Sequence, residues 1–179
     1  MIYPPLDDSL LLAEQVKKHC FGKEVLDMGT GSGIQAETAL NNNAKSILSA
    51  DINEESTPIL KKKGIKFIHS DLFSNISGEF DLIIFNPPYL PLDEREDKEG
   101  ALTNAGGKKG DELILRFLKQ AILHLKKEGI ILLVVSSLTP QKEIKKLLNQ
   151  LNMEFEVLSE KKFFMEKLEV WKIQKWRKA

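Results

Sequence analysis

Short apolar segments alternate with longer stretches of helical periodicity, and this alternation restricts the possible folds more than any other feature of the chain. The segments with strand character are residues 24–28, 46–52, 66–70, 80–85, 130–135, 155–158 and 168–173. Helical patterns separate most of them, which favours parallel strands joined by crossover helices. The last two segments have no helix between them and predict an antiparallel hairpin. The predicted fold is therefore α/β, with a mostly parallel seven-stranded sheet, an antiparallel edge hairpin and helices on both faces.

Caps and breakers predict where the helices begin and end. Asp8 is placed to cap a first helix. A strong helical pattern runs from Asp111 to about Glu128, and Gly129 is expected to end it. The apolar run 130–135 then predicts a strand that is buried on both faces. Its six residues are far fewer than the ~20 needed to span a bilayer, so we expect no association with a membrane.

Composition excludes several classes of protein. The 179 residues are 42% hydrophobic, which predicts one globular domain over residues 1–179 rather than a disordered chain. Lys and Arg number 26 and so do Asp and Glu, which argues against a protein that grips long nucleic acid by counterion release alone. No signal peptide is apparent, and the single Cys20 cannot form an internal disulfide. We therefore expect a cytoplasmic protein.

Three unusual loops follow predicted strands, at residues 29–33, 71–73 and 86–89. In parallel sheets of this kind, ligands bind beyond the carboxyl ends of the strands. We therefore expect the chemistry of this protein where these three loops meet.

The first of these loops belongs to the segment D-M-G-T-G-S-G at residues 27–33, between a strand and a helix. Glycines in such a place let the backbone turn sharply and let a ligand approach the peptide amides. Asp51 ends the next strand, where a carboxylate can accept both hydroxyls of a ribose. The dinucleotide fingerprint does not fit, because Ile34 stands three places after Gly31, and no Lys-Ser/Thr pair follows to complete a P-loop.

The segment Asn86-Pro87-Pro88-Tyr89 follows the fourth predicted strand. The nitrogen of an amide or aromatic amine is a poor nucleophile because its lone pair is delocalised. The Asn86 side-chain oxygen and the Pro87 carbonyl can each accept one N–H of a substrate NH₂ group, which holds the nitrogen and favours the positive charge that develops on it. Tyr89 can pack flat against a planar amide or base. The histidines lack ligand spacing, so we predict no metal.

Four ordered motifs resemble those of known methyltransferases. Residues 27–33 resemble the first motif of the S-adenosylmethionine-dependent methyltransferases with the Rossmann-like class I fold, and residues 86–89 resemble the N-P-P-[YF] signature of amino-group methyltransferases. Residues 3–12 are similar to the Y-x-P-x-E-D-[ST]-x-L-L opening of the HemK/PrmC-like release-factor glutamine N5-methyltransferases. Ala105-Gly106-Gly107 with Gly110 is similar to the A-G-G-x-x-G stretch of that family. Without an N-terminal helical domain, the chain resembles the compact archaeal and eukaryotic branch.

This resemblance implies a cofactor and a set of site residues. The cofactor is S-adenosyl-L-methionine, which leaves as S-adenosyl-L-homocysteine, and no metal is required. The implied cofactor-binding residues are Asp8, Ser9, Asp27, Gly29, Thr30, Gly31, Gly33, Asp51, Ile52, Asp71, Leu72 and Asn86. The implied catalytic residues are Asn86, Pro87 and Tyr89, and these three together with Pro88 are expected to bind the substrate.

The resemblance also implies a substrate and partners. The branch methylates the glutamine side-chain amide in the Gly-Gly-Gln loop of a class I release factor, and some of its members work with a small zinc-binding activator protein. Asn104 stands where the family usually has a tryptophan, which affects the expected shape of the substrate loop.

Two alternatives remain open at this point, namely methylation of RNA at guanine N2 or adenine N6, and a non-catalytic cofactor-binding module. The segment 91–100 contains five acidic and two basic residues, a net charge of −3. If it borders the site, this charge would repel phosphates and suit a basic protein loop.

Overall fold

The computed structural model describes residues 6–88 and 110–176. The strands are β1 (Glu24–Met28), β2 (Ser46–Asp51), β3 (Lys66–His69), β4 (Phe80–Phe85), β5 (Leu125–Ser136), β6 (Met153–Lys162) and β7 (Lys167–Lys175). The helices are α1 (Asp7–His19), α2 (Ile34–Asn41), α3 (Thr57–Lys62), α5 (Glu112–Ala121) and α6 (Gln141–Gln150), with 3₁₀ turns η1 (Glu54–Ser56) and η2 (Ile122–His124).

These strands form one seven-stranded sheet in the order β3-β2-β1-β4-β5-β7-β6. The first five are parallel to one another. Strand β7 runs antiparallel to β5, and β6 runs antiparallel to β7. The predicted mostly parallel sheet with an antiparallel hairpin at one edge is confirmed.

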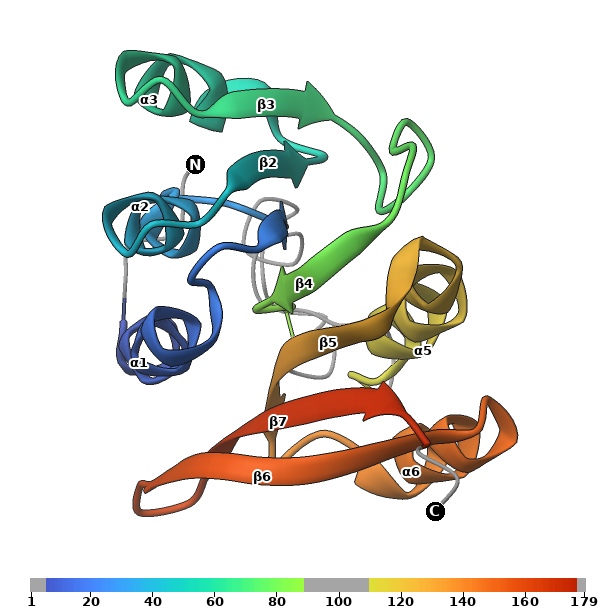
Figure 1. Cartoon of the computed structure of the whole chain (residues 1–179). Coiled ribbons are helices and arrows are strands. Elements are labelled where there is room, and N and C mark those ends of the chain that lie inside the picture. Colours follow the sequence, from blue (N-terminus) through green and yellow to red (C-terminus); the bar gives the residue numbers. More distant parts are fainter. Residues whose placement is uncertain (1–5, 89–109, 177–179) are drawn as a thin grey trace.

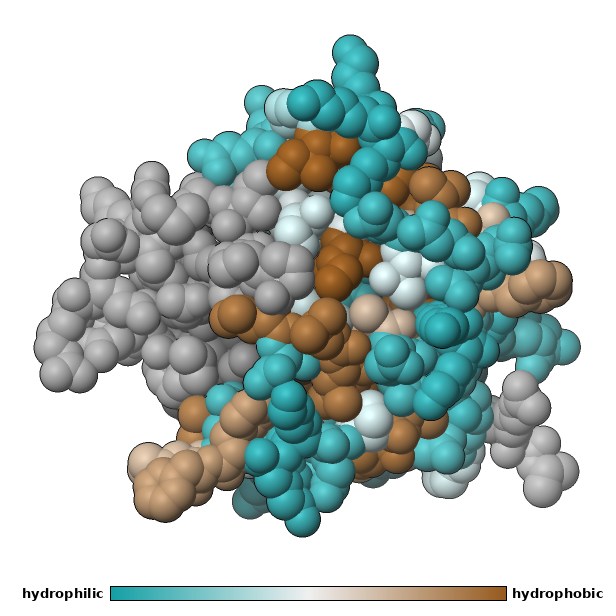
Figure 2. Space-filling view, turned by 90° about the vertical axis from the view of Figure 1, so that its left-hand side faces the viewer, coloured by the Kyte–Doolittle hydropathy of each residue, from teal (hydrophilic) through white to brown (hydrophobic). Residues whose placement is uncertain are grey.

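Helices cover both faces of this sheet. Figure 1 shows α1, α2 and α3 on one side and α5 and α6 on the other. Strand side chains alternate between the two layers, so that Val25 and Leu82 pack in the cluster with α1 and α2, whereas Leu26 and Ile83 pack with α5 and α6. Seen from the side of α1, α2 and α3, hydrophobic side chains show in several places between hydrophilic ones (Figure 2). Each fully buried aliphatic side chain stabilises such a core by about 1.5–3 kcal/mol.

The predicted helix from Asp111 to Glu128 is wrong in its second half. Helix α5 ends at Ala121, and β5 begins at Leu125, five residues before the predicted strand. Leu125 is fully buried and pairs with Phe80 of β4, so tertiary pairing overrides the local helical pattern. Gly129 lies inside the strand rather than ending a helix. A Cβ there would lie 2.9 Å from the Phe80 carbonyl oxygen, so the close approach of β4 requires a residue without a side chain.

The described helices were compared with the requirements for a membrane-spanning helix. None of them, within residues 6–88 and 110–176, combines the length and the apolar character that crossing a membrane requires.

Candidate functional site

Strand register brings the three predicted loops to one edge of the sheet. Met28, the last residue of β1, lies opposite Ala50 of β2 and Phe85 of β4. Asp51 at the end of β2 lies opposite His69 of β3. The carboxyl ends of these four strands therefore lie at one level, and the loops that follow them are neighbours in space.

The loop after β1 keeps open space beside its backbone. Gly31 has a φ of +49°, and a Cβ built there would meet no atom nearer than 3.9 Å. Its N–H donates to Asp51 Oδ2 (2.9 Å), and its carbonyl accepts from the Ser56 hydroxyl (2.6 Å). The loop after β1 is thus joined to the segment after β2, with room for a ligand against the peptide groups.

The carboxylate of Asp27 in β1 forms hydrogen bonds with the loop and with the start of α2. Its side chain is buried, and its Oδ2 accepts from the Thr30 hydroxyl (2.7 Å) and from the Ala36 N–H (3.2 Å). Burial raises the pKa of Asp27 to about 7 against these two hydrogen bonds. The observed contacts are those of a residue that organises the loop, and its predicted contact with a cofactor stays a prediction.

The raised pKa of Asp27 predicts a dependence of stability on pH. A carboxyl group whose pKa rises on folding, here from 3.8 to about 7, binds more protons in the folded state. It therefore makes the free energy of unfolding fall as pH rises from about 4 to about 7. Asp27→Asn removes this contribution, so the variant should gain stability relative to the native chain by about 1–3 kcal/mol between pH 5 and 7.5. Denaturant unfolding at both pH values measures the difference.

A matched control for this experiment is Asp81→Asn. The pKa of Asp81 is lowered by hydrogen bonds from the Glu24 N–H and Lys126, which outweigh its partial burial. Its contribution to stability is therefore lost only as pH falls below its unfolded pKa of 3.8, so the stability of this variant relative to the native chain should stay constant between pH 5 and 7.5. Equal pH dependence in the Asp27→Asn variant and the native chain would contradict the raised pKa.

The Asp51 carboxylate lies at the end of β2, half-buried, with both oxygens facing main-chain donors. Besides the bond from Gly31, its Oδ1 accepts from the Asn53 N–H (2.9 Å). The next side chain, Ile52, is 59% exposed, and its carbonyl bonds the ring of His69. An acceptor beside an exposed apolar side chain suits the ribose and base of a nucleoside, although the predicted contacts of both residues remain predictions.

The loop after β3 contains one unusual backbone conformation. Leu72 is buried with a φ of +48°, a left-handed conformation that non-glycine residues adopt at a cost of order 1–3 kcal/mol. Asp71 is half exposed and forms an ion pair with Arg116 of α5. Arg116 belongs to no sequence motif, so the sequence does not predict its contact with Asp71. The prediction that Asp71 binds the cofactor stays a prediction.

Asn86 lies at the end of β4, with its side chain turned toward the start of α1. Its Nδ2 donates to Asp8 Oδ2 (3.0 Å) and lies 3.4 Å from the Ser9 hydroxyl. Its Oδ1 is buried and has no hydrogen-bond partner among residues 6–88 and 110–176. Pro87, directly after it, is buried. A buried acceptor without a partner is unfavourable, so its presence here points to a ligand that donates to it.

The expectation that Asp8 caps α1 is wrong. The helix begins at Asp7 with Leu6 as its N-cap, so Asp8 lies inside the first turn and its carboxylate bonds Asn86 and the Ser9 N–H. Gln35 of α2 was not predicted as a site residue, yet its Nε2 donates to the Ser9 carbonyl (2.8 Å). It has no motif in the sequence, and only the packing of α1 on α2 reveals it.

Several predicted features lie outside the described residues. These are Tyr89, the opening at residues 3–5, the acidic segment 91–100 and the A-G-G stretch at residues 105–107. Within the described residues, no group of three His, Cys, Asp or Glu side chains could hold a metal ion.

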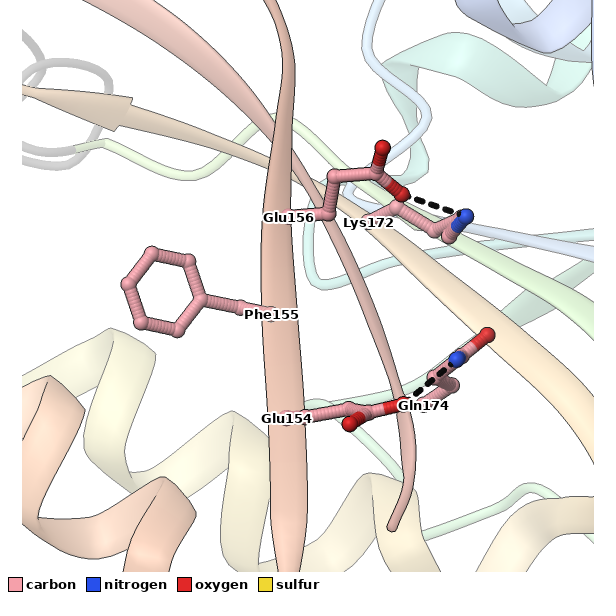
Figure 3. A pocket seen from close by; sticks show the side chains of 5 residues that line it. All are labelled: Glu154, Phe155, Glu156, Lys172 and Gln174. Atoms are coloured by element: carbon pink, nitrogen blue, oxygen red, sulfur yellow. Dashed lines mark hydrogen bonds and ion pairs between the residues drawn. The ribbon is translucent and has the colours of Figure 1, made fainter. Parts of the chain in front are cut away.

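A surface hollow elsewhere lies on the β6–β7 hairpin, where it is lined by Glu154, Phe155, Glu156, Lys172 and Gln174. Figure 3 shows that Glu156 pairs with Lys172 and Glu154 with Gln174, while Phe155 points away from these four. Its polar side chains therefore bond one another, and the hollow lies at the far edge of the sheet from β1. It does not compete with the loops at the carboxyl ends of the strands as a candidate site.

Comparisons with known proteins show the family to which this chain belongs. The methyltransferase small domain family matches residues 6–165. A relative from Methanocaldococcus jannaschii, provisionally named a protein N5-glutamine methyltransferase, is 37% identical over 98% of this chain and 92% of its own length. A release factor glutamine methyltransferase from Lactococcus lactis is 29% identical over 70% of this chain, which spans about half (51%) of that longer relative.

One solved structure covers nearly the whole of both chains. It is the E. cuniculi Mtq2–Trm112 complex, described as responsible for methylation of the translation termination factor eRF1. Its TM-score is 0.79 at 27% identity, over 97% of this chain and 98% of the other.

Proposed function

Because the chain belongs to the methyltransferase small domain family and is a methyltransferase, we propose that it methylates the side-chain amide nitrogen of a glutamine in the Gly-Gly-Gln loop of a class I release factor. The single observation that carries this proposal is the buried Asn86 Oδ1, which has no partner in the part of the chain that the structure describes. An acceptor in that position can hold a primary amide through one of its N–H groups.

We infer that S-adenosyl-L-methionine is the cofactor and that the residues present fit it. The open space beside Gly31 leaves room against the peptide backbone, and Asp51 with Ile52 offers an acceptor next to an apolar surface. When bound, the cofactor supplies a methyl group that its sulfonium already activates. Calorimetry with S-adenosylmethionine tests this inference, and absence of both heat and thermal stabilisation would contradict it.

The chain's own residues orient the substrate in this proposal. Asn86 Oδ1 and the Pro87 carbonyl each accept one N–H of the glutamine amide, which aims the remaining lobe of the nitrogen away from both acceptors. The same two acceptors stabilise the positive charge that develops on the nitrogen. The ring of Pro87 locks its φ and the following Pro88 restricts its ψ, so together they limit the direction of the Pro87 carbonyl. Tyr89 is proposed to pack against the amide plane.

Substrate and partner proposals draw on the relatives. The names of the M. jannaschii and L. lactis proteins support a glutamine side chain as acceptor, and the description of the Mtq2–Trm112 complex supports a release factor as substrate. The same description supports a small activator subunit, which we propose binds zinc. Residues 1–179 are proposed to act as one catalytic domain.

Transfer of a radiolabelled methyl group tests the proposed substrate. The protein, alone and with an activator of the Trm112 type, is incubated with labelled cofactor and a purified class I release factor. Label should enter the release factor and should be absent from a release factor whose Gly-Gly-Gln glutamine is replaced by alanine. Ribosomal and transfer RNA serve as competing acceptors, and label in RNA alone would overturn the proposal in favour of RNA methylation.

A further inference from the structure

We propose that Asp8 is a positioning residue, which holds the Asn86 amide so that its oxygen faces the substrate. This inference rests on the proposed function and deepens it, because it assigns Asp8 to the orientation of the substrate clamp rather than to the cofactor. The carboxylate is only 4% exposed and lies on the first turn of α1, next to the carboxyl end of β4.

The hydrogen-bonding capacity of the Asp8 carboxylate decides which way the Asn86 amide points. A carboxylate only accepts hydrogen bonds, whereas an amide group has a donor nitrogen and an acceptor oxygen. The atom 3.0 Å from Asp8 Oδ2 must therefore be Nδ2, since a flipped amide would bring two oxygens to that distance. The opposite atom, Oδ1, is the buried acceptor left without a partner in the described chain. Without Asp8, either orientation of the amide becomes available, and only one of them accepts from the substrate.

Asp8 is itself held in place by its neighbours. Its second oxygen, Oδ1, accepts from the Ser9 N–H (2.7 Å) and lies 3.4 Å from the Ser9 hydroxyl. The Ser9 carbonyl in turn accepts from Gln35 Nε2 of α2. Leu12 and Val16 anchor α1 on the face of the sheet. The carboxylate therefore has little freedom to follow a movement of Asn86.

The charge on Asp8 adds to this geometric effect. Hydrogen bonds to a charged acceptor are shorter and stronger than neutral ones. When the N–H of an amide donates to such an acceptor, the amide group is polarised. Its oxygen then becomes a better acceptor for a second hydrogen bond. The Asp8–Asn86 pair thus strengthens the contact that the substrate nitrogen needs as positive charge develops on it.

Kinetics of Asp8 variants separate this role from cofactor binding. Asp8→Ala should lower kcat on the release factor by about 10–100-fold, the usual loss when an orienting partner is removed. The Kd for S-adenosylmethionine should stay within about threefold, and KM should change less than kcat. Asp8→Asn should recover part of kcat because its side-chain oxygen can still accept from Asn86. The matched control is Asp7→Ala, since Asp7 is half exposed and pairs with Lys161 away from Asn86.

A readout that needs no substrate tests the contact itself. In protein labelled with ¹⁵N-asparagine, the Asn86 side-chain amide should exchange its protons at least tenfold more slowly in the native chain than in Asp8→Ala. Exchange should be unchanged in Asp7→Ala. If the native enzyme labels no release factor, the proposed function fails, and this exchange experiment still decides the role of Asp8. Unchanged exchange in Asp8→Ala, or a loss of activity that saturating S-adenosylmethionine fully restores, would overturn the inference.

Discussion

Replacing Asn86 with alanine is expected to lower kcat for release-factor methylation by about 10²–10³-fold, the size of the loss when one preorganised hydrogen bond to developing charge is removed. The reason is the unpartnered Oδ1, which the variant lacks and which no neighbouring described side chain replaces. Binding of S-adenosylmethionine should persist, because the contacts around Gly31 and Asp51 do not depend on Asn86. Transfer of labelled methyl groups gives kcat, and calorimetry gives the Kd of the cofactor.

The control for this experiment is Asn149→Ala, a change of the same residue type at an exposed position on α6. It should leave both kcat and cofactor Kd unchanged. Retained activity in Asn86→Ala would refute the amide clamp, whereas loss of cofactor binding together with activity would place Asn86 in the cofactor site.

Replacing Gly33 with alanine is expected to destabilise the protein by about 2–5 kcal/mol, the sum of two separate costs. Gly33 has a φ of +78°, and an L-residue in that left-handed region costs about 1–2 kcal/mol. Its Cβ would also lie 2.7 Å from Leu60 Cδ2, inside a buried cluster, and such overpacking costs about 1–3 kcal/mol. The free energy of unfolding is obtained from denaturant titration.

Gly64 provides a matched control for the second cost. It has a φ of +69°, and a Cβ built there would meet no atom within 4 Å. Gly64→Ala should therefore show only the conformational cost, about 1–2 kcal/mol. The Gly33 variant should also bind S-adenosylmethionine more weakly, because relief of the contact between its Cβ and Leu60 shifts the turn that the N–H of residue 33 closes on the Thr30 carbonyl (2.8 Å). Equal destabilisation in the two variants would show that Leu60 moves aside without cost.

The parallel part of the fold was predictable because its signals are local. Apolar runs such as 80–85 and the glycine loop 29–33 mark a strand and its ending without knowledge of any partner. The amino end of β5 was not predictable in this way. Residues 125–128 have a helical pattern, and their strand conformation depends on pairing with β4 and on the contacts of Lys126 with Glu24 and Asp81.

Within the candidate site, the residue types were predictable but their contacts were not. Asn86 and Pro87 stand in a recognisable motif, and their placement at the end of β4 agrees with the expected chemistry. Asp8 was expected to cap a helix, and only the docking of α1 against β4 turns it toward Asn86. The contacts of Gln35 with Ser9 of α1 and of Ser56 with Gly31 of the loop after β1 also join residues 26 and 25 positions apart, which no local pattern predicts.

By itself, then, the sequence determined the alternation of strands and helices, the unusual loops that follow the strands and the position of Asn86 at the end of β4, because each of these depends on residues close together in the chain. The tertiary structure alone decided which way the Asn86 amide points, that Asp27 is buried beneath the glycine loop, and that Asp8 lies beside β4. These properties depend on hydrogen bonds and burial between distant segments. Such contacts form only when α1 packs on the sheet and the carboxyl ends of β1, β2 and β4 come to one level.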